Sequence, residues 1–113
     1  MKDRRLISEV RVILQRLKPE EKAFPFDDIH DGNALGKRTK LGGKPDWIQF
    51  PEETMCQYCQ MEMTFIAQID SIDDFVASGI DYSEAEYMFD DVGMLYVFYC
   101  FECGETATFC QGY

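Results

Sequence analysis

Two pairs of cysteines with the same spacing are the residues best suited to chemistry in this chain. One pair lies in MCQYCQMEM and the other in VFYCFECGET, and each has two residues between its thiols. A tight turn at this spacing brings two sulfur atoms together, and four thiolates form a tetrahedral set that suits Zn2+. The predicted metal ligands are Cys56, Cys59, Cys100 and Cys103. With all four positions taken by thiolate, the ion is expected to be structural rather than catalytic.

The elements beside the cysteine pairs must bring them together. From Met61 onward apolar and polar residues alternate, which predicts a half-buried strand. Its inward side chains would be Met61, Met63, Phe65, Ala67 and Ile69, and its outward ones Glu62, Thr64, Gln68 and Asp70. The run MLYVFYCF, from Met94, predicts a second strand that is covered on both faces. The start of the first strand can lie beside the end of the second only if the two are antiparallel.

Cys110 and His30 stand outside this arrangement. Cys110 is expected to be a core or edge thiol, or a substitute ligand if Cys56 or Cys59 is not used. His30, the single histidine, is expected at the surface, with no neighbour in sequence that would make it a ligand or a general base. The alternative to a metal site is four reduced thiols that act as small apolar side chains. A thioredoxin-like dithiol fits less well, because neither pair follows a strand and opens a helix.

The first part of the chain predicts a helix. Apolar residues recur there at helical spacing, Asp3 can cap the start, and Lys18-Pro19 ends it. The apolar stripe consists of Leu6, Val10, Ile13, Leu14 and Leu17. We expect it to pack on the domain body, and a docking helix is the alternative. Residues 19–46 predict loop with short strands, because glycine and proline interrupt them often.

Together these elements predict an α+β fold. It would combine the N-terminal helix with a small antiparallel sheet, stapled by a zinc-ribbon-like site of four cysteines, and ETATFCQGY would supply one further strand. Residues 1–37 would form a helix and loop extension, and residues 38–113 a zinc-binding, β-rich domain, within one globular unit. A chain of 113 residues buries a limited core, so a metal crosslink would add to its stability.

Charge divides sharply along the sequence. The eleven Lys and Arg all lie at or before Lys44, where seven Asp and Glu accompany them, for a balance of +4. Residues 45–113 carry fourteen acidic side chains and no basic one, for a balance of −14. Such a stretch repels phosphate backbones, which argues against nucleic acid as its partner. A protein with a basic surface is the natural complement, and the alternative is that the acidic side chains only keep the domain in solution.

No catalytic signature accompanies the cysteines. The sequence contains no G-x-S-x-G, no phosphate-binding glycine loop and no H-E-x-x-H, and a Cys110–His30 couple has no supporting feature. Catalysis is therefore not expected. The start, MKDRRLISEV, lacks the apolar centre of a signal peptide, and no apolar run approaches the roughly 20 residues that cross a bilayer. We expect a cytoplasmic protein with reduced cysteines and no membrane partner.

The stretches LGGKPDWIQFPEETMCQYCQMEMTFIAQID and DDVGMLYVFYCFECGETATFCQGY resemble the cysteine-bearing members of the YwqG-like family, which largely lacks an assigned function. The likeness covers residues 38–113 and consists of a GGxPxW entry, the two cysteine pairs, an M-x-F-x-x-Q strand, an LYVF strand and a Q-x-Y end. The matching positions outside the cysteines include Gly42, Gly43, Pro45, Trp47, Met63, Phe65, Gln68, Gln111 and Tyr113. A weaker likeness links the chain to programmed-cell-death-2-type proteins, which are implicated in ribosomal-protein handling.

These features predict a small zinc-stabilised domain that binds a protein. The YwqG-like resemblance implies an immunity-type protein as one possibility, since some members accompany polymorphic toxins. Its acidic surface would cover a basic partner, with Tyr82, Tyr87 and Phe89 as candidate apolar anchors. The alternatives are an accessory housekeeping domain whose zinc only maintains the fold, and a factor that handles ribosomal proteins.

Overall fold

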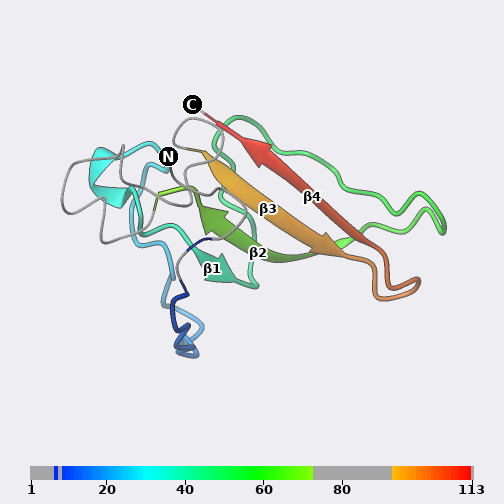
Figure 1. Cartoon of the computed structure of the whole chain (residues 1–113), viewed down its shortest axis with the longest axis horizontal. Coiled ribbons are helices and arrows are strands. Elements are labelled where there is room, and N and C mark those ends of the chain that lie inside the picture. Colours follow the sequence, from blue (N-terminus) through cyan, green and yellow to red (C-terminus); the bar gives the residue numbers. More distant parts are fainter. Residues whose placement is uncertain (1–6, 8, 73–92, 113) are drawn as a thin grey trace.

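A four-stranded antiparallel sheet organises the chain, as the computed structural model shows (Figure 1). The structure describes residues 7, 9–72 and 93–112. Each strand pairs with its neighbour in sequence, in the order β1-β2-β3-β4. The strands are β1 (Lys40–Leu41), β2 (Thr64–Asp70), β3 (Met94–Tyr99) and β4 (Thr106–Gln111), and a short 3-10 turn, η1, spans Gly32–Ala34. The antiparallel pairing of β2 with β3 confirms the arrangement that the cysteine spacing required.

The predicted α+β class is wrong, because the described residues contain no α-helix and the fold is essentially all-β. Residues 9–18 adopt no regular structure, and they project away from the sheet beside β1 (Figure 1). Val10, Ile13 and Leu14 are 54%, 84% and 72% exposed. An amphipathic helix of this length draws most of its stability from packing its apolar stripe, and β-branched residues weaken it further. Without a surface to pack on, the stripe does not form the helix that its spacing predicted.

A β-bulge in β2 reverses the predicted pattern of inward and outward side chains. Phe65 pairs with Phe98 and Ala67 with Val97, so Ile66 is an extra residue between two pairs. Before the bulge the prediction holds, because Phe65 is buried. After it the faces exchange, and Gln68 and Asp70, predicted to face solvent, are buried. Conversely, Ile69 is 37% exposed. Met61, predicted to be the first inward residue of the strand, precedes β2 and is also exposed.

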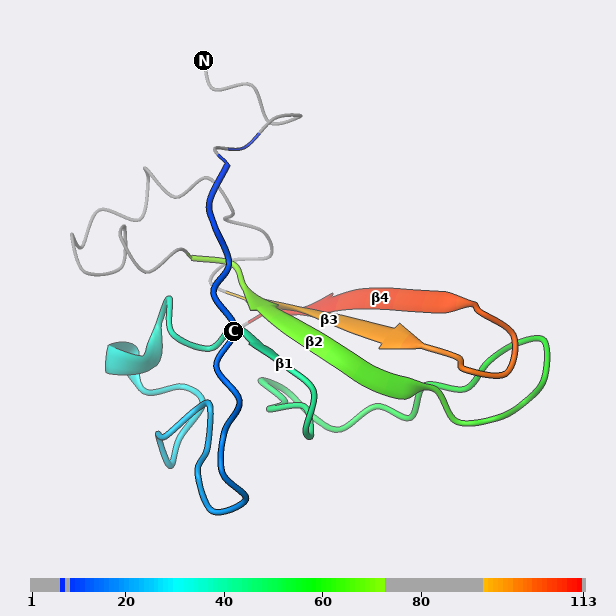
Figure 2. The same cartoon turned by 90° about the horizontal axis from the view of Figure 1, so that it is seen from below.

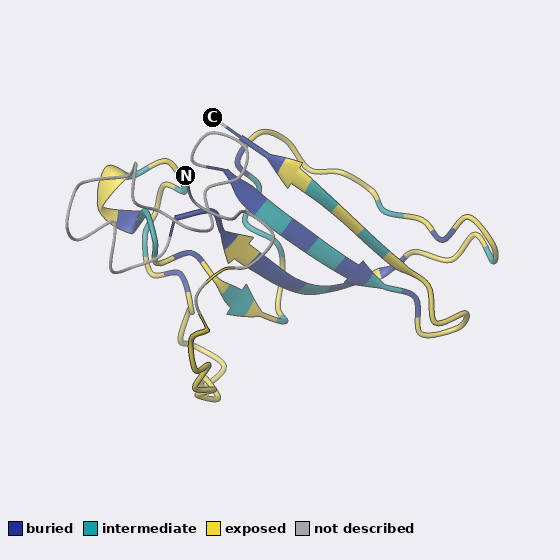
Figure 3. Cartoon of the chain, in the orientation of Figure 1, coloured by how far each residue is buried: buried dark blue, intermediate teal, exposed yellow. Residues whose placement is uncertain are grey.

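The apolar run of β3 occupies the centre of the sheet. Its side chains alternate between buried and half-buried along the strand, so only one face is fully covered (Figure 3). The prediction of full cover on both faces is therefore wrong for the second face. On the covered face Met94, Tyr96 and Phe98 are 0%, 0% and 5% exposed, and Trp47 packs against Tyr96 with ring centroids 4.8 Å apart. This face of the sheet holds the hydrophobic core.

Within the described residues, chain without regular structure rather than a second layer covers the core. The segment that joins β1 to β2 runs along one face of the sheet (Figure 2), and Ile48 within it is 4% exposed. We call residues 45–54 the covering segment. Its backbone N–H and C=O groups need partners once they are buried, and strand or helix neighbours do not supply them here.

Side chains of three strands supply those partners. Gln68 of β2 accepts a hydrogen bond from Asp46 N at 2.9 Å, and Gln111 of β4 accepts one from Gln49 N at 3.0 Å. Between them, the hydroxyl of Tyr96 in β3 donates to Asp46 O at 2.7 Å and accepts from Ile48 N at 3.1 Å. Burial raises the pKa of Tyr96 to about 12, so its phenol keeps the proton that it donates. The row of polar side chains thus satisfies the covering segment as a neighbouring strand would.

A buried ion pair fixes the start of β1 to the end of β2. The guanidinium of Arg38 donates to both carboxylate oxygens of Asp70, from Nε at 2.8 Å and from one terminal nitrogen at 2.9 Å. Their side chains are 0% and 1% exposed. Asp70 also accepts from the backbone N–H groups of Gly36 and Ile72, and Arg38 donates to Gly93 O. Because the carboxylate and the guanidinium satisfy each other, both charges can lie inside the fold.

Several predictions from the sequence lie outside the described residues. These include the candidate anchors Tyr82, Tyr87 and Phe89, the Asp3 cap and Leu6 of the predicted helix, and the Tyr113 end of the Q-x-Y motif. The expected short strand between residues 19 and 46 is confirmed as β1, and the strand expected in ETATFCQGY is confirmed as β4.

Replacing Asp70 by Asn should destabilise the domain strongly. It would leave the buried Arg38 charge without a counter-charge, and we expect the free energy of unfolding to fall by about 3–5 kcal/mol. Denaturant unfolding of the metal-loaded chain would measure the loss. The matched control is Lys40→Gln, which breaks the partly exposed pair between Lys40 and Asp46 and should cost about 1 kcal/mol or less. Equal losses for the two variants would contradict the role assigned to the buried pair.

Candidate metal centre

The first cysteine pair lies on a tight hairpin that leads into β2. Cys56 N donates to Met61 O and Gln60 N donates back to Cys56 O, both at 2.9 Å, which closes the turn around the pair. An isolated bridge between Met55 and Glu62 holds the base of the hairpin. Gln60 takes the left-handed backbone conformation, with φ of 65°. A side chain there costs on the order of 1 kcal/mol or more, so this turn is strained where glycine would not be.

The second pair lies in the turn between β3 and β4, and it repeats the same backbone pattern. Cys100 N donates to Glu105 O and Gly104 N donates to Cys100 O, both at 2.8 Å. Gly104 has φ of 77°, so it occupies the position that Gln60 holds in the first turn. The two turns are therefore equivalent in geometry, although only the second carries the glycine that favours it.

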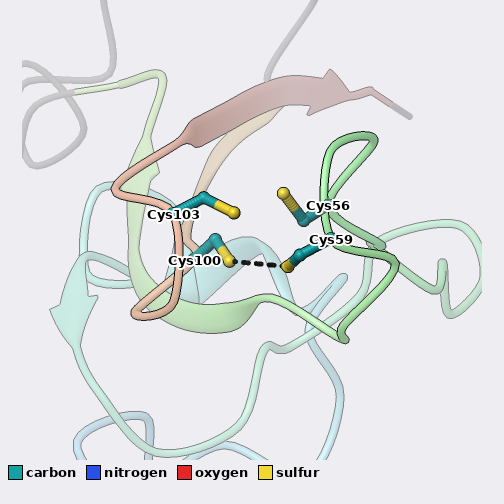
Figure 4. A group of neighbouring side chains, drawn as sticks. All are labelled: Cys56, Cys59, Cys100 and Cys103. Atoms are coloured by element: carbon teal, nitrogen blue, oxygen red, sulfur yellow. Dashed lines mark hydrogen bonds between the residues drawn. The ribbon is translucent and has the colours of Figure 1, made fainter.

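The two turns face each other, and all four sulfur atoms point into the space between them (Figure 4). The Sγ atoms of Cys56, Cys59, Cys100 and Cys103 all lie within 4.8 Å of one another. The Sγ atoms of Cys59 and Cys100 are 3.6 Å apart. Cys56 and Cys100 are 1% and 2% exposed, whereas Cys103 lies at the surface. The structure thus brings together the four residues that the spacing singled out, although Cys59 and Cys100 are 41 positions apart in the sequence.

These distances fit a tetrahedral metal ion and do not fit disulfides. Four sulfurs at about 2.3 Å from one ion lie about 3.8 Å from each other, close to the observed spacing. A disulfide would need its sulfurs about 2.05 Å apart. Four soft thiolate donors in this arrangement suit a soft or borderline divalent ion. The cluster is therefore consistent with a structural metal site, in which each turn supplies two ligands.

Backbone amides and neighbouring thiols shift the acidities within the cluster in opposite directions. The N–H groups of Cys59 and Tyr58 stabilise the Cys56 thiolate and lower its pKa to about 7. The backbone N–H of Met61 favours the Cys59 thiolate, yet burial and the nearby thiols outweigh it and raise the pKa of Cys59. Contact with Cys59, together with burial, raises the pKa of Cys103 to about 12. Four thiolates this close repel one another, so full ionisation of the cluster requires a bound cation.

Sequence reasoning does not identify which backbone amides tune these sulfurs. The relevant groups are backbone N–H groups of Tyr58, Cys59 and Met61, which every residue other than proline possesses. No residue type signals them. The one sequence cue is Gly104 after the second pair, because glycine there permits the turn that directs amides toward sulfur.

Cys110 and His30 lie away from the cluster. Cys110 is an exposed residue on the edge strand β4, as expected of an edge thiol, and it is not among the four clustered sulfurs. His30 lies at the surface, as predicted, and its ring does have polar neighbours. Its Nε2 atom lies 2.8 Å from Ile48 O and its Nδ1 atom 3.2 Å from Asp28 Oδ1. Hydrogen bonds from the backbone and side chain of His30 lower the pKa of the Asp28 carboxyl. The ring thus ties the loop at 28–31 to the covering segment.

Comparison with known proteins gives one partial relative and no function. Seventy residues of the chain, 62% of its length, are 39% identical to the uncharacterised protein YpfL of Salmonella typhimurium strain LT2. They span only 14% of that protein, so the chain matches a small part of a longer relative. No protein-family model matches the sequence, and no solved structure matches it. The resemblance to the YwqG-like family accordingly stays a prediction. Among the described residues, no helix is long and apolar enough to cross a membrane.

Replacing Cys103 by Ser should remove a ligand and weaken both metal binding and folding. Ligation free energy in a structural site is folding free energy, so we expect a lower unfolding midpoint and less bound divalent metal per chain. Elemental analysis of the purified chain, combined with thermal unfolding, would measure both. Cys110→Ser is the matched control, and it should change stability by about 1 kcal/mol or less without changing metal content. Loss of metal from the Cys110 variant alone would show that the ligands are assigned wrongly.

Metal affinity should rise with pH, because binding displaces protons from the thiols. Near neutral pH the raised pKa values of Cys59 and Cys103 keep both protonated, so Zn2+ uptake should release at least these two protons. Cys56 contributes a further share below its pKa of about 7 and little above it. Calorimetric titration with Zn2+ in buffers of different ionisation enthalpy, at about pH 6 and about pH 8, would count the protons. A larger release at the higher pH would contradict the prediction.

Proposed function

We propose that this chain is a zinc-stabilised β domain that binds a protein with a basic surface. The observation that carries the zinc assignment is the convergence of four cysteine sulfurs within 4.8 Å. Among common cellular ions, Zn2+ combines a preference for thiolate with tetrahedral geometry and no redox chemistry. The ion would hold the β3–β4 turn against the hairpin that precedes β2.

The donor set supports a structural rather than a catalytic ion. Four cysteine ligands fill a tetrahedral shell and leave no position for water or substrate. Both ring nitrogens of His30 lie beside protein oxygen atoms, which favours a positioning role for that residue over proton transfer. We therefore infer binding rather than catalysis for this domain.

The distribution of acidic side chains supports a basic protein as the partner. Asp70 and Asp46 pair with Arg38 and Lys40, which come from the basic first part of the chain. Among the described residues after residue 44, the carboxylates with no ion pair lie on the surface. They are Glu52, Glu53, Glu62, Glu102 and Glu105. Since residues 45–113 hold no lysine or arginine, this surface presents negative charge that no neighbouring cation in that stretch balances.

The biological setting of this binding is a choice between two proposals. The YwqG-like resemblance favours an immunity-type role, in which the domain covers a basic toxin. The alternative is an accessory domain, or a ribosomal-protein handler of the programmed-cell-death-2 type, since ribosomal proteins are also basic. The relative YpfL is itself uncharacterised and favours neither. A toxin gene beside the coding gene would favour immunity.

Affinity purification followed by mass spectrometry tests the proposed function directly. The metal-loaded chain should retain a basic protein at about 0.05 M salt and release it by about 0.5 M, because screening removes the attraction between exposed charges. Retention of one partner at equal yield across that range would rule out an electrostatic interface. A control column carrying an unrelated acidic protein separates specific partners from general binders of negative charge.

A further inference from the structure

A cavity opens between the covering segment and the core face of the sheet, next to the metal-bearing hairpin. Its volume is about 320 Å³. That size lies within the range of small-ligand pockets. Three aromatic side chains line it, Trp47 from the covering segment, Phe65 from β2 and Phe98 from β3. Trp47 and Phe98 lie nearly parallel, with an interplanar angle of 13°, and Phe65 meets Phe98 edge-on. The cavity therefore has walls of aromatic rings.

Carboxylates surround these aromatic walls. Glu52, Glu53 and Glu62 line the same cavity, and all three residues are exposed. The described residues that line the cavity include no lysine, arginine or histidine. Glu52 is held in place, because Gln111 Nε2 donates to one of its carboxylate oxygens at 2.8 Å. Negative charge thus collects beside three aromatic rings.

A buried hydroxyl in the cavity wall has no partner among the described residues. Thr54 Oγ1 is shielded from solvent and makes no hydrogen bond, although Thr54 O accepts one from Met63 N at 2.8 Å. Thr54 is also one of the residues that line the cavity. A buried polar atom without a partner costs about 1–3 kcal/mol. Because Oγ1 is shielded from solvent, it lies behind the cavity wall and out of direct reach of a ligand in the cavity.

We propose that this pocket binds the cationic side chain of a lysine or arginine on the protein partner. The alkyl stem would pack on Trp47, which is half-buried and so the most accessible of the three rings, and the cationic head would lie within reach of the carboxylates. The head is also a hydrogen-bond donor, and the exposed carboxylates beside the cavity can accept from it. This inference rests on the proposed function, and it names the residues that would recognise the basic partner.

Other ligand classes fit the pocket less well. An anion would be repelled by three carboxylates. A neutral apolar ligand would contact the aromatic part but leave the carboxylates without a counter-charge. A bare divalent ion prefers several converging oxygen ligands, whereas here the interior walls are aromatic rings. Only a group with an apolar stem and a charged donor at its end matches each wall.

The single tryptophan makes the pocket directly observable. Trp47 is the chain's one tryptophan, so its fluorescence reports on the cavity without labelling. We would titrate the metal-loaded chain with hexalysine and with fully acetylated hexalysine. We expect hexalysine to change the Trp47 emission saturably and the acetylated peptide, which lacks the charges, to bind at least about tenfold more weakly.

Matched variants separate the pocket from the rest of the acidic surface. Glu53→Gln/Glu62→Gln removes two carboxylates at the pocket, and Glu102→Gln/Glu105→Gln removes two exposed ones outside it. Hexalysine affinity should fall about tenfold for the first variant and about twofold or less for the second. All four positions are at the surface, and circular dichroism would check that both variants fold.

Each outcome bears on one of the two proposals. Equal losses in the two double variants, or an unchanged Trp47 emission despite binding, would overturn the pocket and leave the basic partner standing. Equal binding of acetylated and unmodified peptide to the original chain would overturn the recognition of charge. If neither peptide binds, both this inference and the electrostatic form of the proposed function fail.

Discussion

The structure depends on how the covering segment shields the core face of the sheet from water, since the described residues form no second layer of strands or helices. The covering segment lies over that face, and chain without regular structure has no ladder of its own to hold it. It must be fixed at both ends. At one end four sulfurs join the hairpin at 55–62 to the turn after β3, and a bound ion would lock that junction. In a chain of 113 residues the core is limited in size, so such a crosslink would add to its stability.

The other end of the covering segment is fixed by polar side chains of the core face. Gln68, Tyr96 and Gln111 come from three adjacent strands, and their hydrogen bonds replace those of a missing neighbouring strand. Such groups are costly to bury alone, yet each one here is satisfied. At the β1 end of the sheet, the buried Arg38–Asp70 pair likewise consists of polar groups that satisfy each other. The core face therefore combines apolar packing with satisfied polar contacts. Together these contacts fix one position for the covering segment.

The parts of this architecture that sequence predicts are those governed by local spacing. Two C-x2-C turns and the direction of two strands suffice to place four sulfurs together, because each turn is closed within a few residues. The faces of β2 could not be predicted, since the bulge at Ile66 depends on how β3 pairs with it. For the same reason Gln68 and Asp70 looked like surface residues. The prediction of an N-terminal helix was wrong because apolar residues at helical spacing stabilise a helix only where they pack against a surface.

The candidate metal centre and the aromatic pocket are built on the same two elements, the hairpin at 55–62 and β3. The hairpin that carries Cys56 and Cys59 also carries Glu62, and Thr54 and Met63 are joined across its base by a hydrogen bond of 2.8 Å. The opposite wall of the pocket, Phe98, lies in β3, two residues before Cys100. An ion held by all four sulfurs would therefore fix the carboxylate side of the pocket relative to its aromatic side. If the pocket binds the partner as proposed, a structural metal in this fold would also be a determinant of binding, because the sulfurs join the two elements that form the pocket.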